Sequence, residues 1–369
     1  MRILHLLTRF LDRGAERNTL DFMAWQREAG HEVELAAGAT SSDDRFPFDT
    51  ALHRVPHLVR RPDPIADVRA LLEIGGLLRE GRYDVLHTHQ AKAGILGREA
   101  ARNLPIVRIH SIHGPSFARA NGAISAPVYL RAERHAARHT KAWISVGQEL
   151  RDLHVAAGIG RPEQHWVIRS PIDVERFLSV RSLGAQEREE VRDRLGIDPA
   201  ARIILSIGAL DPHKRPVQLL EWVAPLLRRD AVLVLVGGGP LENELRRQAA
   251  ALDLADRVLL PGRTDHAEAY LAVADVLAHA SANEGVSQVI LQALAAGVPV
   301  VATDVCGLRE VREASIDIVP ESGKGFGERV GRVLAGPHAG MTPAASLRPW
   351  EEDRIRDAIQ AFHQGVLGT

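Results

Sequence analysis

The chain has 369 residues, enough for two domains of ordinary size, and its 45% hydrophobic and 25% charged residues are typical of soluble globular proteins. The formal net charge of −1 gives no global indication of nucleic-acid binding, and the single cysteine, Cys306, excludes an intramolecular disulfide and a Cys-based metal site while fitting a reducing compartment. No apolar run approaches the ~20 residues needed to span a bilayer, and the N-terminal apolar run is too short for a signal peptide, so we expect a cytoplasmic protein that binds no nucleic acid.

The first half of the chain alternates strand-like and helix-like segments. Residues 3–7 form an apolar run, and Gly14 and Ala15 open a helical stretch that continues to Trp25. Further strands are expected at residues 31–36, 84–89, 106–111 and 142–146. This alternation predicts an α/β fold with a doubly wound parallel sheet.

The second half repeats the same alternation. It restarts with an apolar run at residues 203–208. Further strands are expected at residues 231–237, 257–262, 276–280 and 300–303. We therefore expect a second parallel sheet and place the boundary near residues 168–178, before the polar run 179–202.

Residues 284–303 combine the start of a helix with polar side chains at fixed offsets. Glu284 is followed by small residues and then by an apolar run at helical spacing, which Gly297 caps and Pro299 stops. The first N–H groups of this helix are expected to be unpaired and to suit a phosphate. They belong to Val286, Ser287 and Gln288. Gln292, about two turns further on, can present its amide to the same cleft.

This segment resembles the signature of retaining glycosyltransferases of the GT-B fold, in particular glycosyltransferase family 4. In that signature a Glu is followed, after seven residues, by a second Glu, then small residues and Gly-x-Pro-Val-Val-Ala-Thr. Here Gln292 replaces the second Glu, and Cys306 precedes Gly307 where a Gly-Gly pair often stands. An ordinary β-loop-helix-β unit is the alternative, but the spacing and the Gly-x-Pro ending match together.

The resemblance covers nearly the whole chain. It includes the first strand and loop, the loops after residues 84–89 and 106–111, and the helix after Trp350. It implies two Rossmann-like domains that face each other across a cleft. Residues 1–172 would form the acceptor-binding domain, residues 173–348 the donor-binding domain, and residues 349–369 a helix that crosses back to the first domain.

The resemblance also implies roles in donor binding. Lys214 fits the Lys that contacts the donor's diphosphate, whereas Ala209 stands in place of an Arg. Arg215, Arg263 or a protonated His213 are candidates for the missing charge, and a solvated turn lysine is the alternative for Lys214. Glu284 would hold hydroxyls of the donor sugar, and Gln292 would meet the ribose. Donor contacts are expected at Gly14, Ala15, Gly208, Gly237, Gly238, Gly262, Arg263, Val286, Ser287, Gln288 and Gln292.

His113 follows a predicted strand and precedes Gly114. The resemblance places it near the transferred sugar, where it would donate to sugar hydroxyls or to phosphate; a strand-end His that is satisfied by backbone is the alternative. His87, His89 and His110 have both a functional and a structural interpretation. His87 and His89 share a strand face and could bind a metal, but no third and fourth ligand with matching spacing is evident, so we expect no metal.

The implied activity is that of a retaining hexosyltransferase. The donor would be a UDP- or GDP-sugar, the acceptor a glycan, a lipid-linked molecule or a small molecule, and the departing phosphate would take the acceptor proton without a further cofactor. A nucleotide-sugar-binding protein without transferase activity is an alternative, which Ala209 and Gln292 favour. Another is an epimerase of the same fold. A third, an NAD-dependent oxidoreductase, lacks its glycine fingerprint at residues 237–242.

Basic residues of the first half suggest a contact with a membrane. Arg131, Arg134, Arg138 and Lys141 are spaced three, four and three apart, so they are expected to share one helix face. Such a face could bind the anionic inner leaflet peripherally. The alternative is a solvated helix face that Glu133 partly balances.

Overall fold

The computed structural model describes residues 1–10, 14–39, 52–115, 117, 125–311, 316–336 and 342–368. The chain divides into two compact units. The first contains Met1–Pro171 together with Asp353–Thr369, and the second contains Ile172–Glu352.

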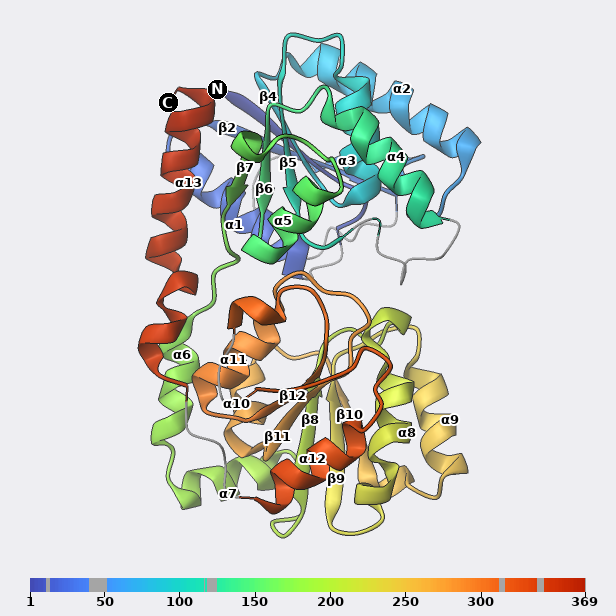
Figure 1. The fold of residues 1–369 in the computed structure, drawn as a ribbon, viewed down its shortest axis with the longest axis vertical. Coiled ribbons are helices and arrows are strands. Elements are labelled where there is room, and N and C mark those ends of the chain that lie inside the picture. Colours follow the sequence, from blue (N-terminus) through green and yellow to red (C-terminus); the bar gives the residue numbers. More distant parts are fainter. Residues whose placement is uncertain are drawn as a thin grey trace. The chain divides into compact units, whose positions relative to one another are not determined.

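In the described residues of the first unit, the sheet has the strand order β3-β2-β1-β4-β5-β6-β7, and neighbouring strands run parallel (Figure 1). Its strands are β1 (Arg2–Leu7), β2 (Glu32–Gly38), β3 (Leu52–Val55), β4 (Val85–His89), β5 (Val107–Ile112), β6 (Ala142–Ser145) and β7 (His165–Val167). Its helices are α1 (Gly14–Glu28), α2 (Pro64–Gly81), α3 (Ala91–Ala100), α4 (Ser125–Ala137), α5 (Gln148–Ala156) and the C-terminal α13 (Glu352–Leu367).

The C-terminal helix α13 belongs to the core of the first unit, although it follows the second unit in the sequence. Its buried Ile355, Ile359 and Phe362 pack in one hydrophobic cluster with Ile3 of β1 and Phe22 of α1. The clustering is favourable because it removes one apolar face of α13 from water.

The described sheet of the second unit has the order β10-β9-β8-β11-β12-β13, again with parallel neighbours. Its strands are β8 (Arg202–Ile207), β9 (Ala231–Val236), β10 (Val258–Gly262), β11 (Val276–His279), β12 (Val300–Thr303) and β13 (Ile316–Val319). Its helices are α6 (Val174–Leu178), α7 (Ala185–Arg194), α8 (Pro216–Leu227), α9 (Glu242–Ala251), α10 (Ala267–Val273), α11 (Gln288–Ala296) and α12 (Phe326–Ala335).

The two sheets confirm the predicted doubly wound α/β architecture. Both reverse their winding after the first strand of the unit, between β1 and β4 and between β8 and β11. The strands β3, β7 and β13 were not predicted, because each lies at an edge of its sheet and mixes polar with apolar residues, so it lacks the continuous apolar run of a buried strand.

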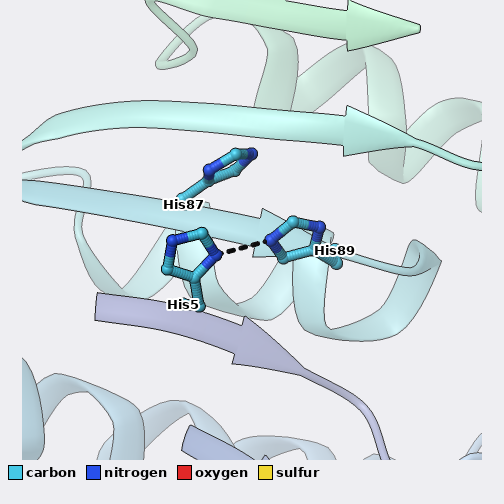
Figure 2. Close-up of side chains that lie close together, drawn as sticks. All are labelled: His5, His87 and His89. Atoms are coloured by element: carbon cyan, nitrogen blue, oxygen red, sulfur yellow. Dashed lines mark hydrogen bonds between the residues drawn. The ribbon is translucent and has the colours of Figure 1, made fainter. Parts of the chain in front are cut away.

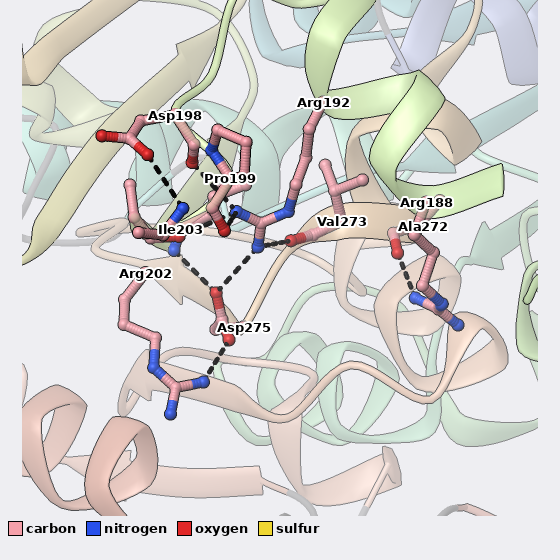
Figure 3. A network of polar contacts seen from close by, with 11 residues as sticks. Arg188, Arg192, Asp198, Pro199, Arg202, Ile203, Ala272, Val273 and Asp275 are labelled. Carbon is pink, nitrogen blue, oxygen red and sulfur yellow. Dashed lines mark hydrogen bonds and ion pairs between the residues drawn. The ribbon is translucent and has the colours of Figure 1, made fainter. Parts of the chain in front are cut away.

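The polar run 179–202 contains α7. Arginine side chains near it form hydrogen bonds and ion pairs with other segments of the second unit (Figure 3). Arg192 Nη2 lies 3.6 Å from Asp275 Oδ2, and the same oxygen accepts from the Ile203 backbone N–H at 2.7 Å. Asp275 Oδ1 accepts from Arg202 at 2.8 Å. Arg192 also donates to the carbonyl oxygens of Asp198, Pro199, Ala201 and Val273. Both carboxylate oxygens of the buried Asp275 therefore have partners, which is the condition for stable burial of a charge.

One prediction about the surface of the first unit is wrong. Helix α4 ends at Ala137, so Arg138 and Lys141 lie beyond it and cannot share a helix face with Arg131 and Arg134. Nor does Glu133 balance that surface. It is buried and pairs with the buried Arg98 at 2.6 Å, a contact that the sequence pattern could not reveal.

Candidate active site

A pocket lies where the second sheet reverses its winding, between β8 and β11. Ligands of open α/β sheets bind outside the carboxyl ends of the strands at such a reversal. The hollow spans about 290 Å³, which includes space open to solvent. Most of its lining comes from β8, the turn that follows it and the end of β11. The lining residues are Ser206, Ile207, Gly208, Ala209, Leu210, Lys214, Pro216, Leu235, His279, Ala280 and Ser281.

Lys214 and Glu284 form an ion pair beside this pocket. Lys214 ends the short turn Pro212–Lys214 after β8, and Glu284 lies in the loop between β11 and α11. Lys214 Nζ donates to Glu284 Oε1, and His279 Nε2 of β11 lies 3.4 Å from the same oxygen. The Lys214 and Glu284 side chains are only 22% and 15% exposed. The fold thus joins two sequence-predicted site residues that are 70 positions apart.

The charges of this cluster follow from its contacts. Burial alone would raise the pKa of Glu284, but the Lys214 ammonium and His279 outweigh it and hold that pKa well below its usual range. Burial lowers the pKa of His279, so its imidazole is neutral near pH 7. Glu284 is therefore an ionised acceptor and Lys214 its cation.

Glycines let the loops after β8, β9 and β10 approach one another. Gly208 and Gly237 have φ angles of +154° and +147°, and a Cβ on Gly237 would overlap the Gly208 carbonyl. The Gly237 N–H donates to the Gly262 carbonyl at 2.8 Å. Gly238 lies against the exposed Arg263, whose Nε would be 3.4 Å from an added Cβ. These five predicted donor-binding residues therefore lie at adjoining strand ends.

Helix α11 begins where the sequence predicted an anion-binding helix start. Ser287 occupies the N-cap position, Gln288 is the first helical residue, and Val286 precedes them. Gly297 ends the helix in the left-handed conformation with φ +79°, as predicted. Gln292 lies on the second turn and is half-buried.

The three candidates for the missing positive charge differ in their surroundings. Arg215 donates to the Glu321 carbonyl at 2.5 Å and lies 3.5 Å from the Glu321 carboxylate, which holds it away from a ligand. His213 Nδ1 lies 3.9 Å from the buried Asp211. Arg263 is exposed directly after β10 and lies against Gly238.

The predicted residues Gly14, Ala15 and His113 belong to the first unit. Gly14 and Ala15 begin α1, and His113 follows β5 and is half-buried. Gln90, which the sequence did not single out, lies directly after β4 with φ 61° and ψ 150°, a region that side chains rarely adopt. Its amide donates to the buried Glu16 at 2.9 Å. Backbone strain of this kind is common near ligand sites, but a glutamine in the sequence does not indicate it.

His5 and His89 form a hydrogen bond inside the sheet of the first unit, and His87 lies over the pair (Figure 2). His5 Nδ1 and His89 Nε2 are 2.9 Å apart. The His87 ring stacks on His89 with centroids 4.4 Å apart, and its Nε2 lies 2.8 Å from Ser111 Oγ. His110 faces the other way, with Nδ1 2.8 Å from Thr88 Oγ1 and its ring against Trp143, as expected of a structural core histidine.

Two groups of side chains among the described residues could hold a metal ion. One nitrogen each from His5, His87 and His89 lies within 4.8 Å of the others. The sequence spacing revealed neither a third nor a fourth ligand for His87 and His89, and the fold brings in His5 from the neighbouring strand β1 as a third. Two of these rings, however, already bond each other. The second group is Glu99, His135 and His139, in which His135 Nε2 and Glu99 Oε2 are 3.4 Å apart. That the protein binds no metal stays a prediction.

Comparisons with known proteins identify similar families for both halves. Residues 187–336 match the family described as glycosyl transferases group 1, and residues 13–169 match the glycosyl transferase 4-like domain. A D-inositol 3-phosphate glycosyltransferase of Kineococcus radiotolerans is 30% identical over 365 residues, which cover 89% of this chain and 80% of that protein.

A second relative is the UDP-Gal:alpha-D-GlcNAc-diphosphoundecaprenol alpha-1,3-galactosyltransferase of Escherichia coli. It is 30% identical over 260 residues, which cover 69% of this chain and 66% of that protein. Among solved structures, HepE of Anabaena in complex with UDP and glucose superimposes with a TM-score of 0.79 and 19% identity, over all of both chains. That likeness concerns the fold.

Proposed function

Because the chain belongs to the glycosyl transferases group 1 family, and is thus a GT-B glycosyltransferase that uses a nucleotide-sugar donor, we propose that it is a retaining hexosyltransferase acting on a UDP-sugar and a lipid-linked glycan. The observation that carries the proposal is the Lys214–Glu284 ion pair beside the pocket between β8 and β11. Family membership also disfavours the alternatives of a non-catalytic binding protein, an epimerase and an oxidoreductase.

The ammonium and the carboxylate of the ion pair suit the diphosphate and the sugar of a nucleotide-sugar, respectively. An ammonium group stabilises the negative charge that develops on a departing diphosphate, and an ionised carboxylate accepts hydrogen bonds from sugar hydroxyls. We assign the first role to Lys214 and the second to Glu284. The N–H groups at the start of α11 and the exposed Arg263 would add to the positive potential around the phosphates.

The charge state of Glu284 favours a mechanism in which the anomeric configuration is retained and the departing diphosphate acts as the base. A general acid or base works best with a pKa near the working pH, and the pKa of Glu284 is held far below it. Glu284 is therefore a poor proton carrier, and its ion pair with Lys214 makes it a poor nucleophile. In the mechanism we propose, the acceptor attacks the face that the diphosphate leaves, and a phosphate oxygen takes the acceptor's proton.

The choice of donor and acceptor rests on the relatives and on one surface of this chain. The Escherichia coli relative is named for a UDP-sugar donor and a diphosphoundecaprenol-linked acceptor. In this chain Ile65, Val68 and Leu72, spaced along α2, are 69%, 60% and 69% exposed. Arg61 and Arg69 are exposed beside them. An amphipathic helix of this kind suits the surface of a membrane that carries a lipid-linked acceptor.

We propose that this exposed stripe on α2 supplies the apolar anchor for the contact with a membrane. No helix within the described ranges is long and apolar enough to cross a membrane. Peripheral attachment is thus the form of membrane contact that we propose.

The proposal can be tested with a panel of UDP- and GDP-hexoses. Thermal unfolding would first identify the donor, since a ligand at 100 times its dissociation constant stabilises by about 2.7 kcal/mol. Product formation on lipid-linked and free glycan acceptors would then define the reaction, and proton NMR of the product would report its anomeric configuration. Inversion at the anomeric carbon, or stabilisation by GDP-sugars alone, would overturn the proposal.

A further inference from the structure

A continuous line of hydrogen bonds leads from His113 through the first unit to its C-terminal helix. His113 Nε2 lies 3.2 Å from His89 Nδ1, and His89 Nε2 lies 2.9 Å from His5 Nδ1. His5 Nε2 lies 2.7 Å from Gln26 Oε1 on α1, and Gln26 Nε2 lies 3.2 Å from His363 Nε2 on α13. The five residues come from five different segments, so this relay is a product of the tertiary fold.

Most of the relay is shielded from water, and His113 at its end is half-buried. His5, His89 and Gln26 are at most 1% exposed, and His363 is 6% exposed. Burial lowers the pKa of His5, His113 and His363 to about 4 and that of His89 well below its ordinary value. Each imidazole is therefore neutral near pH 7, with one N–H donor and one acceptor nitrogen.

Gln26 fixes the direction of every bond in the relay. Its Oε1 can only accept, so His5 donates from Nε2 and must accept at Nδ1. His89 then donates from Nε2 and accepts at Nδ1, and His113 donates from Nε2. At the other end the Gln26 amide N–H donates to His363 Nε2, so His363 carries its proton on Nδ1. One amide orientation thus sets the proton position in four imidazoles.

We propose that Gln26, His5 and His89 are positioning residues that hold His113 in its Nε2–H form, so that His113 Nδ1 accepts a hydrogen bond from a hydroxyl group of a sugar substrate. That His113 meets a sugar rests on the proposed function, whose substrates are sugars, and on the family resemblance of its position. A phosphate oxygen without a proton cannot donate to Nδ1, so the relay selects a hydroxyl partner over the diphosphate. The sequence-based expectation was instead that His113 donates a hydrogen bond, either to a sugar hydroxyl or to a phosphate.

His87 explains how the relay stays ordered. Its ring covers the bonded pair, with centroids 4.7 Å from His5 and 4.4 Å from His89. Its Nε2 is engaged with Ser111. A stacked aromatic cover excludes water that would compete for the His5–His89 hydrogen bond, and in a low-dielectric site that bond is stronger than in water.

The proton positions can be measured directly in the full-length protein. We expect long-range ¹H–¹⁵N spectra of ¹⁵N-histidine-labelled protein to show His5, His89 and His113 in the Nε2–H form and His363 in the Nδ1–H form. Single His→Gln variants would assign the signals. A proton on Nδ1 of His113, or on Nε2 of His363, would overturn the relay. This experiment needs no substrate, so its outcome is independent of the transferase activity.

Two variants of Gln26 test whether its influence reaches His113 through two intervening rings. Gln26→Glu keeps an acceptor for His5, so His113 should remain in the Nε2–H form. Gln26→Leu removes the acceptor, so His113 should populate both forms and kcat/KM should fall about fivefold to tenfold, as for one lost hydrogen bond. Arg27→Leu, on the exposed side of the same helix, is the control. Equal spectra of His113 in the Glu and Leu variants would contradict the proposal.

Donor analogues complete the test. The identified UDP-hexose should shift the His113 Nδ1 resonance, whereas UDP, which lacks the sugar hydroxyls, should leave it within error of the free protein. An equal shift with UDP would mean that His113 senses the nucleotide and would overturn its role as a hydroxyl acceptor, even if the relay itself is observed.

Discussion

The two units of this protein bury polar groups in opposite ways. In the second unit Lys214 and Glu284 keep their charges by pairing with each other beside a pocket. In the first unit the side chains of His5, His87 and His89 are fully buried on one face of the sheet. Burial lowers their pKa and keeps them neutral. Both clusters lie where a sheet reverses its winding.

The difference shows that a buried ionisable group can be stabilised either by an opposite charge or by loss of its own charge. A charge that leaves water needs a partner of opposite sign, whereas a group that titrates near pH 6.5 can lose its charge instead. We therefore expect the ion pair of the second unit to act on charge and the relay of the first unit to act on proton position. The predictions below test this contrast.

Loss of Glu284 should have the largest effect. Glu284→Ala removes the carboxylate that we assign to the sugar hydroxyls and leaves Lys214 without its partner, so the rate of transfer should fall about 1,000-fold or more. The fold should remain intact, which circular dichroism and thermal unfolding would check. Glu244→Ala on the exposed side of α9 is a matched control. Turnover like that of the unaltered protein with saturating donor would refute the assignment.

Loss of Lys214 should come next. Lys214→Ala removes the positive charge at the leaving diphosphate, and because Ala209 already replaces an Arg, we expect a loss on the order of 3 kcal/mol, or about 100-fold in kcat/KM. Arg263→Ala should cost less, because this side chain is exposed and the charge is screened. If Arg263→Ala is damaging and Lys214→Ala is harmless, the phosphate contact has been assigned to the wrong residue.

Acid should weaken the first unit before it affects the ion pair. The pKa of His5 and His113 falls to about 4 on folding, so below pH 6.5 the unfolded chain binds protons that the folded chain does not. Their contribution to stability is complete above pH 6.5 and is lost as pH falls toward 4, at about 1.4 kcal/mol per pH unit for each histidine. Glu284, whose pKa is lowered from 4.5, loses its contribution only below pH 4.5.

Urea unfolding between pH 7 and pH 4.5 would measure this difference. His5→Gln should flatten the dependence of the unfolding free energy on pH in this window, because it removes one group that titrates only in the unfolded chain. Glu284→Gln should leave the dependence in the same window unchanged. If the two variants have equal slopes, the proposed contrast between neutral and charged burial is mistaken.

The smallest effect is expected at the surface of the first unit. Leu72→Glu and Arg69→Glu on α2 should each weaken binding to anionic vesicles by about 1 to 2 kcal/mol. Co-sedimentation at low salt would measure it, with Glu244→Ala of the second unit as the control. Equal pelleting with neutral and anionic lipids, or none with either, would leave a protein that acts on a soluble acceptor.

The sequence alone determined the α/β architecture and the helix α11 that follows Glu284. The alternation of apolar runs and helical stretches is a local signal, so it predicted both sheets and all their strands except β3, β7 and β13. The spacing from Glu284 to Gly297 likewise predicted where α11 begins and its glycine cap, because these features lie within one helix, and that its start binds an anion stays a prediction.

Only the tertiary structure decided which distant side chains meet. Gln26 and His363 are 337 positions apart, and His5 and His89 are 84 positions apart, so no local spacing could reveal the relay. The same holds for the role of Glu133, whose partner is on another helix. Local sequence fixes the elements, because helix and strand propensities act over a few residues. The proton positions and charges of the buried side chains are fixed by neighbours that only the packed sheets bring into contact.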